Sequence, residues 1–62
     1  MHTSQTQIQD YARQLLEARG AKAAAEAAQK AAAFEQAGDA AQAETWRRIA
    51  AAVQRMRGAH QS

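Results

Sequence analysis

The sequence lacks cysteine and proline altogether, and it has only three glycines and one residue each of phenylalanine, tyrosine and tryptophan. Without cysteine the chain can form neither a disulfide nor a thiolate metal site, which fits a reducing compartment. The β-branched and aromatic residues that favour strands are scarce. Nineteen of the 62 residues are alanine, the strongest helix former. The composition therefore predicts an all-α fold.

The three glycines divide this helix-forming sequence into segments. Each glycine follows a helix-favouring run, and glycine just past a helix end adopts the left-handed conformation at little cost. We therefore expect a small three-helix domain. Its helices are expected near Ser4–Arg19, Ala21–Ala37 and Asp39–Arg57, in one domain of residues 1–62 with flexible tails at 1–3 and 58–62.

Capping residues mark two of the three helix starts. Thr3 or Ser4 is a candidate N-cap for the first helix, and Gln7 lies three residues after Ser4, as a capping box requires. Asp39 is a good N-cap for the third helix. No comparable residue follows Gly20, so the sequence leaves open whether Gly20 is a kink or a full turn.

Apolar residues recur at steps of three and four in each segment, which is typical of amphipathic helices. The short connection at residues 37–39 predicts an antiparallel hairpin of the second and third helices. The first helix would then fold across this hairpin or across another chain. The expected apolar faces are Ile8, Tyr11, Ala12, Leu15 and Leu16, then Ala24, Ala27, Ala28, Ala31 and Phe34, then Trp46, Ile49, Ala50, Val53 and Met56.

Only nine of these face residues are larger than alanine. Each contributes about 1.5–3 kcal/mol when it is fully buried, whereas ordering the chain costs about 1.5 kcal/mol per residue. Alanine methyl groups, tight helix contacts or another chain must supply the difference. We therefore expect a homo-oligomer or a bound protein partner.

Neither a signal peptide nor a membrane-spanning segment is expected. The stretch MHTSQTQIQD has no cationic start and no apolar run of the kind that a secretory signal carries. Lys22, Glu26 and Lys30 interrupt the alanine-rich stretch, which makes it unsuitable for crossing a bilayer. We expect a cytoplasmic protein.

The stretch TWRRIAAAVQRMRG, residues 45–58, holds four of the eight basic residues and no acid. At about 100° per residue its arginines spread over the whole non-apolar side of a helix and do not form one stripe. We favour a solvated or partner-facing surface, because cations complement a helix C-terminus and Glu44 can pair with Arg48 at i+4. Phosphate contacts with a nucleic acid and contacts with an anionic lipid surface remain open.

No catalytic, cofactor-binding or metal-binding constellation is expected. The two histidines, His2 and His60, fall near the ends of the sequence, and no hydroxyl residue has a core histidine to activate it. The sequence has no glycine-rich phosphate loop. It also has no carboxylate pair in an apolar setting that would suit acid–base chemistry. We therefore expect no enzymatic activity, no cofactor, no metal and no small-molecule substrate.

Two stretches, LLEARGAKAAAEAAQKAA and AETWRRIAAAVQRMRG, resemble short uncharacterised alanine-rich helical proteins of alphaproteobacteria. The shared features are the joint at Gly20, the EAAQKA helix, the GD break, the TWRRI start and the RMRG end. The resemblance extends from about Ile8 to His60. It implies a compact helical bundle, and it carries no established activity and no catalytic or binding residue.

The function expected from these observations is a non-enzymatic protein–protein interaction module that docks helix on helix. The module would be self-associating or an accessory subunit of a larger assembly. The alternative is a small nucleic-acid-associated regulator that uses the basic third helix. The expected core or partner contacts are Ile8, Tyr11, Leu15, Trp46, Ile49 and Val53, and the expected contacts to phosphate or to an acidic partner are Arg47, Arg48, Arg55 and Arg57.

Overall fold

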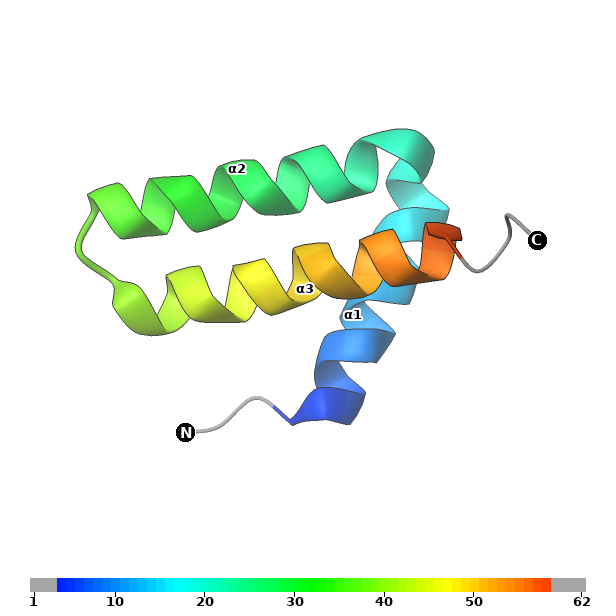
Figure 1. Ribbon diagram of the computed structural model, residues 1–62, viewed down its shortest axis with the longest axis horizontal. Coiled ribbons are helices and arrows are strands. Elements are labelled where there is room, and N and C mark those ends of the chain that lie inside the picture. The colour runs from blue at the N-terminus through cyan, green and yellow to red at the C-terminus, as the bar shows by residue number, and fades with distance from the viewer. Residues whose placement is uncertain (1–3, 59–62) are drawn as a thin grey trace.

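The computed structural model describes residues 4–58, and helices make up nearly all of this range (Figure 1). Residues 4–58 contain no strand, so the predicted all-α fold is confirmed. Helices α2 and α3 lie side by side and antiparallel, and α1 crosses α3 at a steep angle (Figure 1). The elements are α1 (Gln5–Arg19), the single 3₁₀ turn η1 (Gly20–Lys22), α2 (Ala23–Gln36) and α3 (Ala40–Gly58).

None of the helices in the described range combines the length and the apolar character that a bilayer-spanning helix needs. Of the predicted flexible tails, 1–3 and 58–62, residues 1–3 and 59–62 lie outside the described residues. The prediction that Gly58 belongs to the C-terminal tail is wrong, because Gly58 is the last residue of α3.

Helix α1 begins with the capping box that the sequence predicts. The Ser4 hydroxyl oxygen accepts a hydrogen bond from the Gln7 backbone N–H at 3.1 Å, and the Gln7 Oε1 accepts one from the Ser4 N–H at 3.2 Å. These bonds occupy two donors that would otherwise stay unpaired at the helix start. Ser4 itself keeps an extended backbone with ψ of 159°, so the helix proper begins at Gln5.

Gly20 is the residue at which the chain turns from α1 into α2. Its φ of 60° and ψ of −130° form a conformation that is open to glycine and strained for other residues. The Gly20 N–H still donates to the Leu16 carbonyl, and the Gly20 carbonyl accepts from the Ala23 N–H. The joint is therefore a sharp turn made entirely of helical hydrogen bonds. No side chain caps α2, which begins at Ala23, two residues later than predicted.

Gly38 and Asp39 reverse the chain between α2 and α3. Gly38 has φ of 82°, its N–H donates to the Glu35 carbonyl at 3.1 Å, and the Asp39 N–H donates to the Phe34 carbonyl at 2.9 Å. This pair of bonds is a Schellman motif, which ends a helix by satisfying its last carbonyls. The Asp39 Oδ1 then accepts from the Gln42 N–H at 3.1 Å and caps α3, as predicted.

The core is small and lies where α1 crosses the hairpin. Most of its members are alanines, whose short side chains let the helices approach closely. The prediction that Ala28 faces the core is wrong, because the buried face of α2 is centred on Ala27 and Ala28 lies about 100° away from it. The packed cluster consists of Ile8, Ala12, Ala23, Ala24, Ala27, Ile49, Ala52 and Val53.

Candidate functional site

Three of the six predicted core or contact residues are buried in the core. Ile8, Ile49 and Val53 are at most 4% exposed and pack against one another and the buried alanines. Their side chains are almost closed to a partner, although Ile8 and Ile49 form part of the lining of a groove beside Tyr11 and Trp46. They hold α1 against α3, and so they position the side chains that do reach the surface.

The other three predicted contacts lie at the edge of this core. Tyr11 is 46% exposed, and it is the most exposed large apolar side chain in residues 4–58. Leu15 and Trp46 are half-buried and pack against the core from outside. Of the six, this group is therefore the most accessible to another molecule.

Most of the large apolar side chains are left incompletely covered by the fold. Of the nine that the sequence provides between residues 4 and 58, three are buried, five are half-buried and Tyr11 is exposed. Removing such side chains from water is favourable. The parts of these side chains that remain exposed can therefore gain stability by packing against a partner. The five half-buried residues are Leu15, Leu16, Phe34, Trp46 and Met56.

Tyr11 and Trp46 form the centre of a groove between α1 and α3. Their rings meet edge to face, with centroids 5.4 Å apart and planes at 88°, which is a favoured arrangement for aromatic side chains. An open groove of about 370 Å³ lies beside them, and we call it the aromatic groove. Its lining residues are Gln7, Ile8, Tyr11, Gln42, Thr45, Trp46 and Ile49.

None of the residues lining the aromatic groove carries a charge. The polar members are two glutamines and Thr45, whose hydroxyl donates to the Ala41 carbonyl at 3.1 Å and is satisfied within its own helix. A group that enters the groove therefore displaces water from few polar atoms and from no ion. The groove suits an apolar or aromatic side chain.

Trp46 holds the groove in place because it contacts all three helices. It is attached to α3, it meets Tyr11 of α1, and the Lys30 Nζ of α2 lies 5.6 Å from the centroid of its ring. This distance is within the range of a cation–π interaction, which reaches about 6 Å. The contact between Trp46 and Tyr11 depends on how α1 crosses α3, which periodicity alone does not give.

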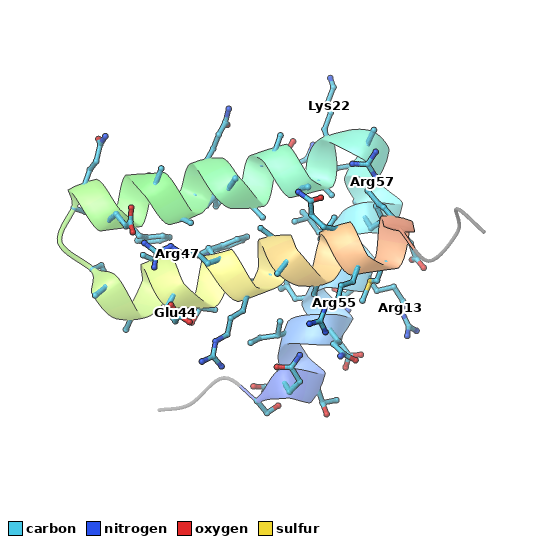
Figure 2. The ribbon with its side chains drawn as sticks, viewed as in Figure 1. Arg13, Lys22, Glu44, Arg47, Arg55 and Arg57 are labelled. Carbon is cyan, nitrogen blue, oxygen red and sulfur yellow. The ribbon has the colours of Figure 1, made fainter. Side chains whose placement is uncertain are left out.

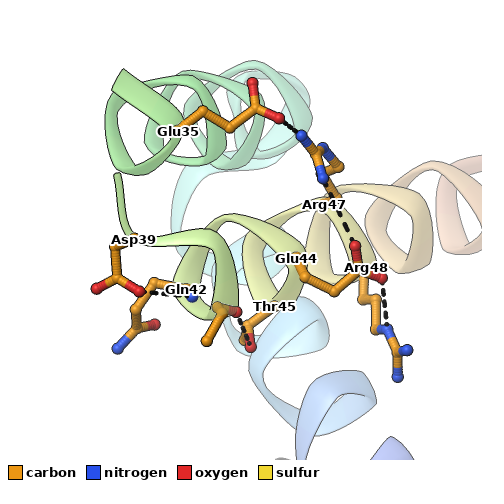
Figure 3. Close-up of polar contacts among 8 residues, drawn as sticks. Glu35, Asp39, Gln42, Glu44, Thr45, Arg47 and Arg48 are labelled. Atoms are coloured by element: carbon orange, nitrogen blue, oxygen red, sulfur yellow. Dashed lines mark hydrogen bonds and ion pairs between the residues drawn. The ribbon is translucent and has the colours of Figure 1, made fainter. Parts of the chain in front are cut away.

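Two of the four predicted arginine contacts are engaged within the chain. Arg47 forms ion pairs with Glu35 of α2 and, at 3.5 Å, with Glu44 (Figure 3). The Arg48 Nε donates to the Glu44 Oε2 at 3.1 Å, which is the predicted i+4 pair (Figure 3). All four side chains are about half-exposed, so each pair contributes only about 0–1 kcal/mol to stability. Their charges are nevertheless largely compensated.

Arg55 and Arg57 have no acidic partner among residues 4–58 and point to different sides of α3 (Figure 2). Arg55 and Arg48 line a second open groove of about 440 Å³ on the other side of the α1–α3 crossing. Arg47 and Arg57 do not take part in it. The structure thus brings two of the four arginines together. The other lining residues are Gln5, Gln9, Ala51, Ala52 and Met56.

Metal-binding side chains do not gather in the described part of the chain. No group of three or more histidine, cysteine, aspartate or glutamate residues lies close together within residues 4–58. His2 and His60, the two histidines considered above, lie outside this range. The aromatic groove is the candidate site among the described residues because the exposed Tyr11 lies in it.

Comparisons with protein-family models, with curated proteins and with solved structures find no match to this chain. A function has to be inferred from the surface described above.

Proposed function

We propose that this chain is a non-enzymatic protein–protein interaction module of the cytoplasm. Its working unit is the three-helix arrangement, in which the α2/α3 hairpin carries α1 across it. It docks helix on helix, either with copies of itself or as an accessory subunit of a larger assembly. The observation that carries the proposal is the exposed Tyr11 beside the uncharged aromatic groove, in a chain that leaves most of its large apolar side chains incompletely buried.

Docking at the aromatic groove is favourable for two physical reasons. Apolar surface that leaves water gains about 25 cal/mol per Å², and tyrosine and tryptophan are enriched among the residues that dominate binding energies. The rim of the groove also avoids the cost of desolvating a charge, because Gln7, Gln42 and Thr45 are neutral. An amphipathic helix that lays an apolar side chain into the groove meets both conditions.

The proposed alternative, a nucleic-acid-associated regulator, has less support from the charges. Phosphate binding needs cations that neutralise several phosphates along one surface. Arg47 and Arg48 already face Glu35 and Glu44. Arg55 and Arg57 are two residues apart on α3, which separates them by about 200° around the helix, and the view with side chains shows them pointing to opposite sides (Figure 2).

A binding experiment tests the proposal and separates it from the alternative. In it the immobilised chain is exposed to the proteins and nucleic acids of a cell extract. At about 500 mM NaCl a protein docked through apolar contacts stays bound, whereas a nucleic acid held by phosphates is released. The variant Tyr11→Ala should lose the bound protein. Gln14→Ala is the matched control, because Gln14 is exposed on the same helix and lines neither groove.

Two results would decide against the interaction module. One is retention of nucleic acid alone, at low salt, that disappears when Arg55 and Arg57 are replaced by glutamine. The other is a chain that stays monomeric at every concentration and retains no protein. Binding that survives high salt and depends on Tyr11 supports the module.

A further inference from the structure

We propose that the second groove, which is lined by Arg48 and Arg55, binds an acidic amphipathic helix of another protein. We call this surface the arginine groove. The bound helix places two carboxylates on the two arginines and an apolar side chain between them. The arginine groove lies on the other side of the α1–α3 crossing from the aromatic groove. The inference therefore rests on the proposed function only in that the ligand is a protein, and it does not depend on what fills the aromatic groove.

The arginine groove combines an apolar strip with polar walls. Between its two arginines the surface of α3 consists of Ala51 and Ala52, and the half-buried Met56 follows. Alanine leaves room for another helix to approach closely, and methionine adapts its shape to different apolar partners. An apolar side chain that packs on this strip leaves water, which is favourable. The α1 wall supplies neutral hydrogen-bonding amides from Gln5 and Gln9.

The spacing of the two arginines matches the repeat of an α-helix. Arg48 and Arg55 are seven residues apart on α3, so they lie about 10.5 Å apart along the axis and about 20° apart around it. Carboxylates at positions i and i+7 of a second helix have the same separation. A helix that lies along α3 can therefore meet both guanidinium groups at once, and arginine–carboxylate hydrogen bonds are among the stronger ones in proteins.

The charge around the arginine groove is positive and incompletely balanced. None of its lining residues is acidic. Arg55 forms no ion pair within residues 4–58, and the pair of Arg48 with Glu44 is through the Nε. A further arginine, Arg13, follows Gln9 by one turn of α1 and lies on the same side of α3 as Arg55 (Figure 2). Arg13 likewise forms no ion pair in the described range.

The acids of this chain are poorly placed to supply the complementary charge from a second copy. Asp10 and Glu17 lie three and four residues from Arg13 on α1. A copy that offered them would also bring its Arg13 against the arginine groove, where like charges repel. The complementary carboxylates therefore come from another protein. The other four acids are used within the chain, as ion-pair partners of arginine or as the cap of α3, and they are Glu26, Glu35, Asp39 and Glu44.

A nucleic acid fits the arginine groove less well than an acidic helix. Phosphate binding draws on cations that follow one surface, and Arg57 points to the other side of α3 from Arg55 (Figure 2). The strip of Ala51, Ala52 and Met56 offers no donor to a phosphate. An amphipathic helix uses both the strip and the guanidinium groups.

Titration of the isotope-labelled full chain with synthetic helical peptides, followed by NMR, tests the proposal. The probe is an alanine-based peptide with glutamates at i and i+7 and leucines at i+3 and i+4, which share one face. We expect amide shifts at Gln9, Ala51 and Met56. A peptide of the same composition, with its glutamates moved to the opposite face, should bind more weakly.

Arg55→Gln should weaken binding of the probe about three- to tenfold, as expected for the loss of one partly exposed arginine–carboxylate pair. Arg57→Gln is the matched control, because it makes the same change of charge on the same helix and Arg57 lines neither groove. It should leave the dissociation constant unchanged. Both arginines are exposed, and circular dichroism checks that each variant keeps its helices.

A reversal of charge tests the pairing itself. Arg55→Glu should reject the acidic probe and should bind one of two peptides in which a single glutamate is replaced by lysine. Which of the two peptides regains affinity gives the direction of the bound helix along α3. If neither peptide does, Arg55 does not pair with the probe and the proposal is wrong.

Two other results would overturn the acidic helix as ligand. One is binding that is equal for both arrangements of glutamate, or that falls equally in Arg55→Gln and Arg57→Gln. The other is a single-stranded DNA oligonucleotide that binds more tightly than the probe and shifts the same amides. In either case the interaction module still stands if the immobilised chain retains a protein through Tyr11, because Tyr11 lines the other groove.

Discussion

Replacing Gly20 by alanine should destabilise the folded chain by about 1–2 kcal/mol. A Cβ atom at this position meets nothing within 4 Å, so the change introduces no clash. The cost comes from the backbone, whose φ of 60° and ψ of −130° disfavour any residue with a side chain. Such strain costs about 1–3 kcal/mol, and the lower entropy of the unfolded alanine chain returns about 0.4–1 kcal/mol of it.

That loss is large for a chain of 62 residues, because folded proteins are stable by only about 0.05–0.15 kcal/mol per residue. Urea unfolding followed by far-ultraviolet circular dichroism measures it directly, as a lower midpoint with an unchanged slope. A thermal scan should show a melting temperature that is lower by about 4–8 °C per kcal/mol lost.

Gly58 supplies the matched control for Gly20. It is the last residue of α3, its φ is not positive, and a Cβ there also meets nothing within 4 Å. Gly58→Ala should therefore stabilise the chain by a few tenths of a kcal/mol, since alanine is the better helix former by at most about 1 kcal/mol. If Gly20→Ala were as stable as Gly58→Ala, or gained helical content, then α1 and α2 would form one continuous helix and the core described here would not exist.

Three further substitutions have definite expected outcomes. Ile8→Ala removes a side chain that is 1% exposed and should cost about 2–5 kcal/mol, seen in thermal scans as a chain that is largely unfolded at room temperature; a loss below 1 kcal/mol would place Ile8 outside the core. Asp39→Ala removes the acceptor for the Gln42 N–H and should cost about 1 kcal/mol in urea unfolding, whereas Asp39→Asn keeps an acceptor and should cost little. Arg47→Ala breaks two exposed ion pairs and should cost less than about 1 kcal/mol, with the difference shrinking in high salt; a salt-independent loss above 2 kcal/mol would contradict the exposed pairing.

The helix ends that the sequence marks with a local signal are found where it places them. The capping box joins Ser4 to Gln7, and the cap of α3 joins Asp39 to Gln42. Both interactions span three residues, so their geometry is set by the helix itself and needs no knowledge of the fold. The same reasoning explains why the i+4 pair of Glu44 and Arg48 is readable from sequence.

Features that depend on how the helices meet could not be read in this way. Periodicity puts Ile8 and Tyr11 on one apolar face, yet the steep crossing of α1 over α3 buries Ile8 and leaves Tyr11 exposed. The pair between Arg47 and Glu35 depends on the register of α2 against α3. The sequence does not specify the sharp turn at Gly20, because no capping residue accompanies it and the structure makes that turn with backbone hydrogen bonds alone.

Thermal unfolding over a hundredfold range of protein concentration tests most directly whether this chain buries its remaining apolar side chains by associating with copies of itself. Association stabilises a native state by mass action, and a partner present at about 100 times its dissociation constant adds about 2.7 kcal/mol. The melting temperature of the parent chain should therefore rise with concentration, and that of Tyr11→Ala should rise less or stay constant. A parent chain that melts at one temperature across the whole range, with a monomeric mass in light scattering on the same samples, would contradict this.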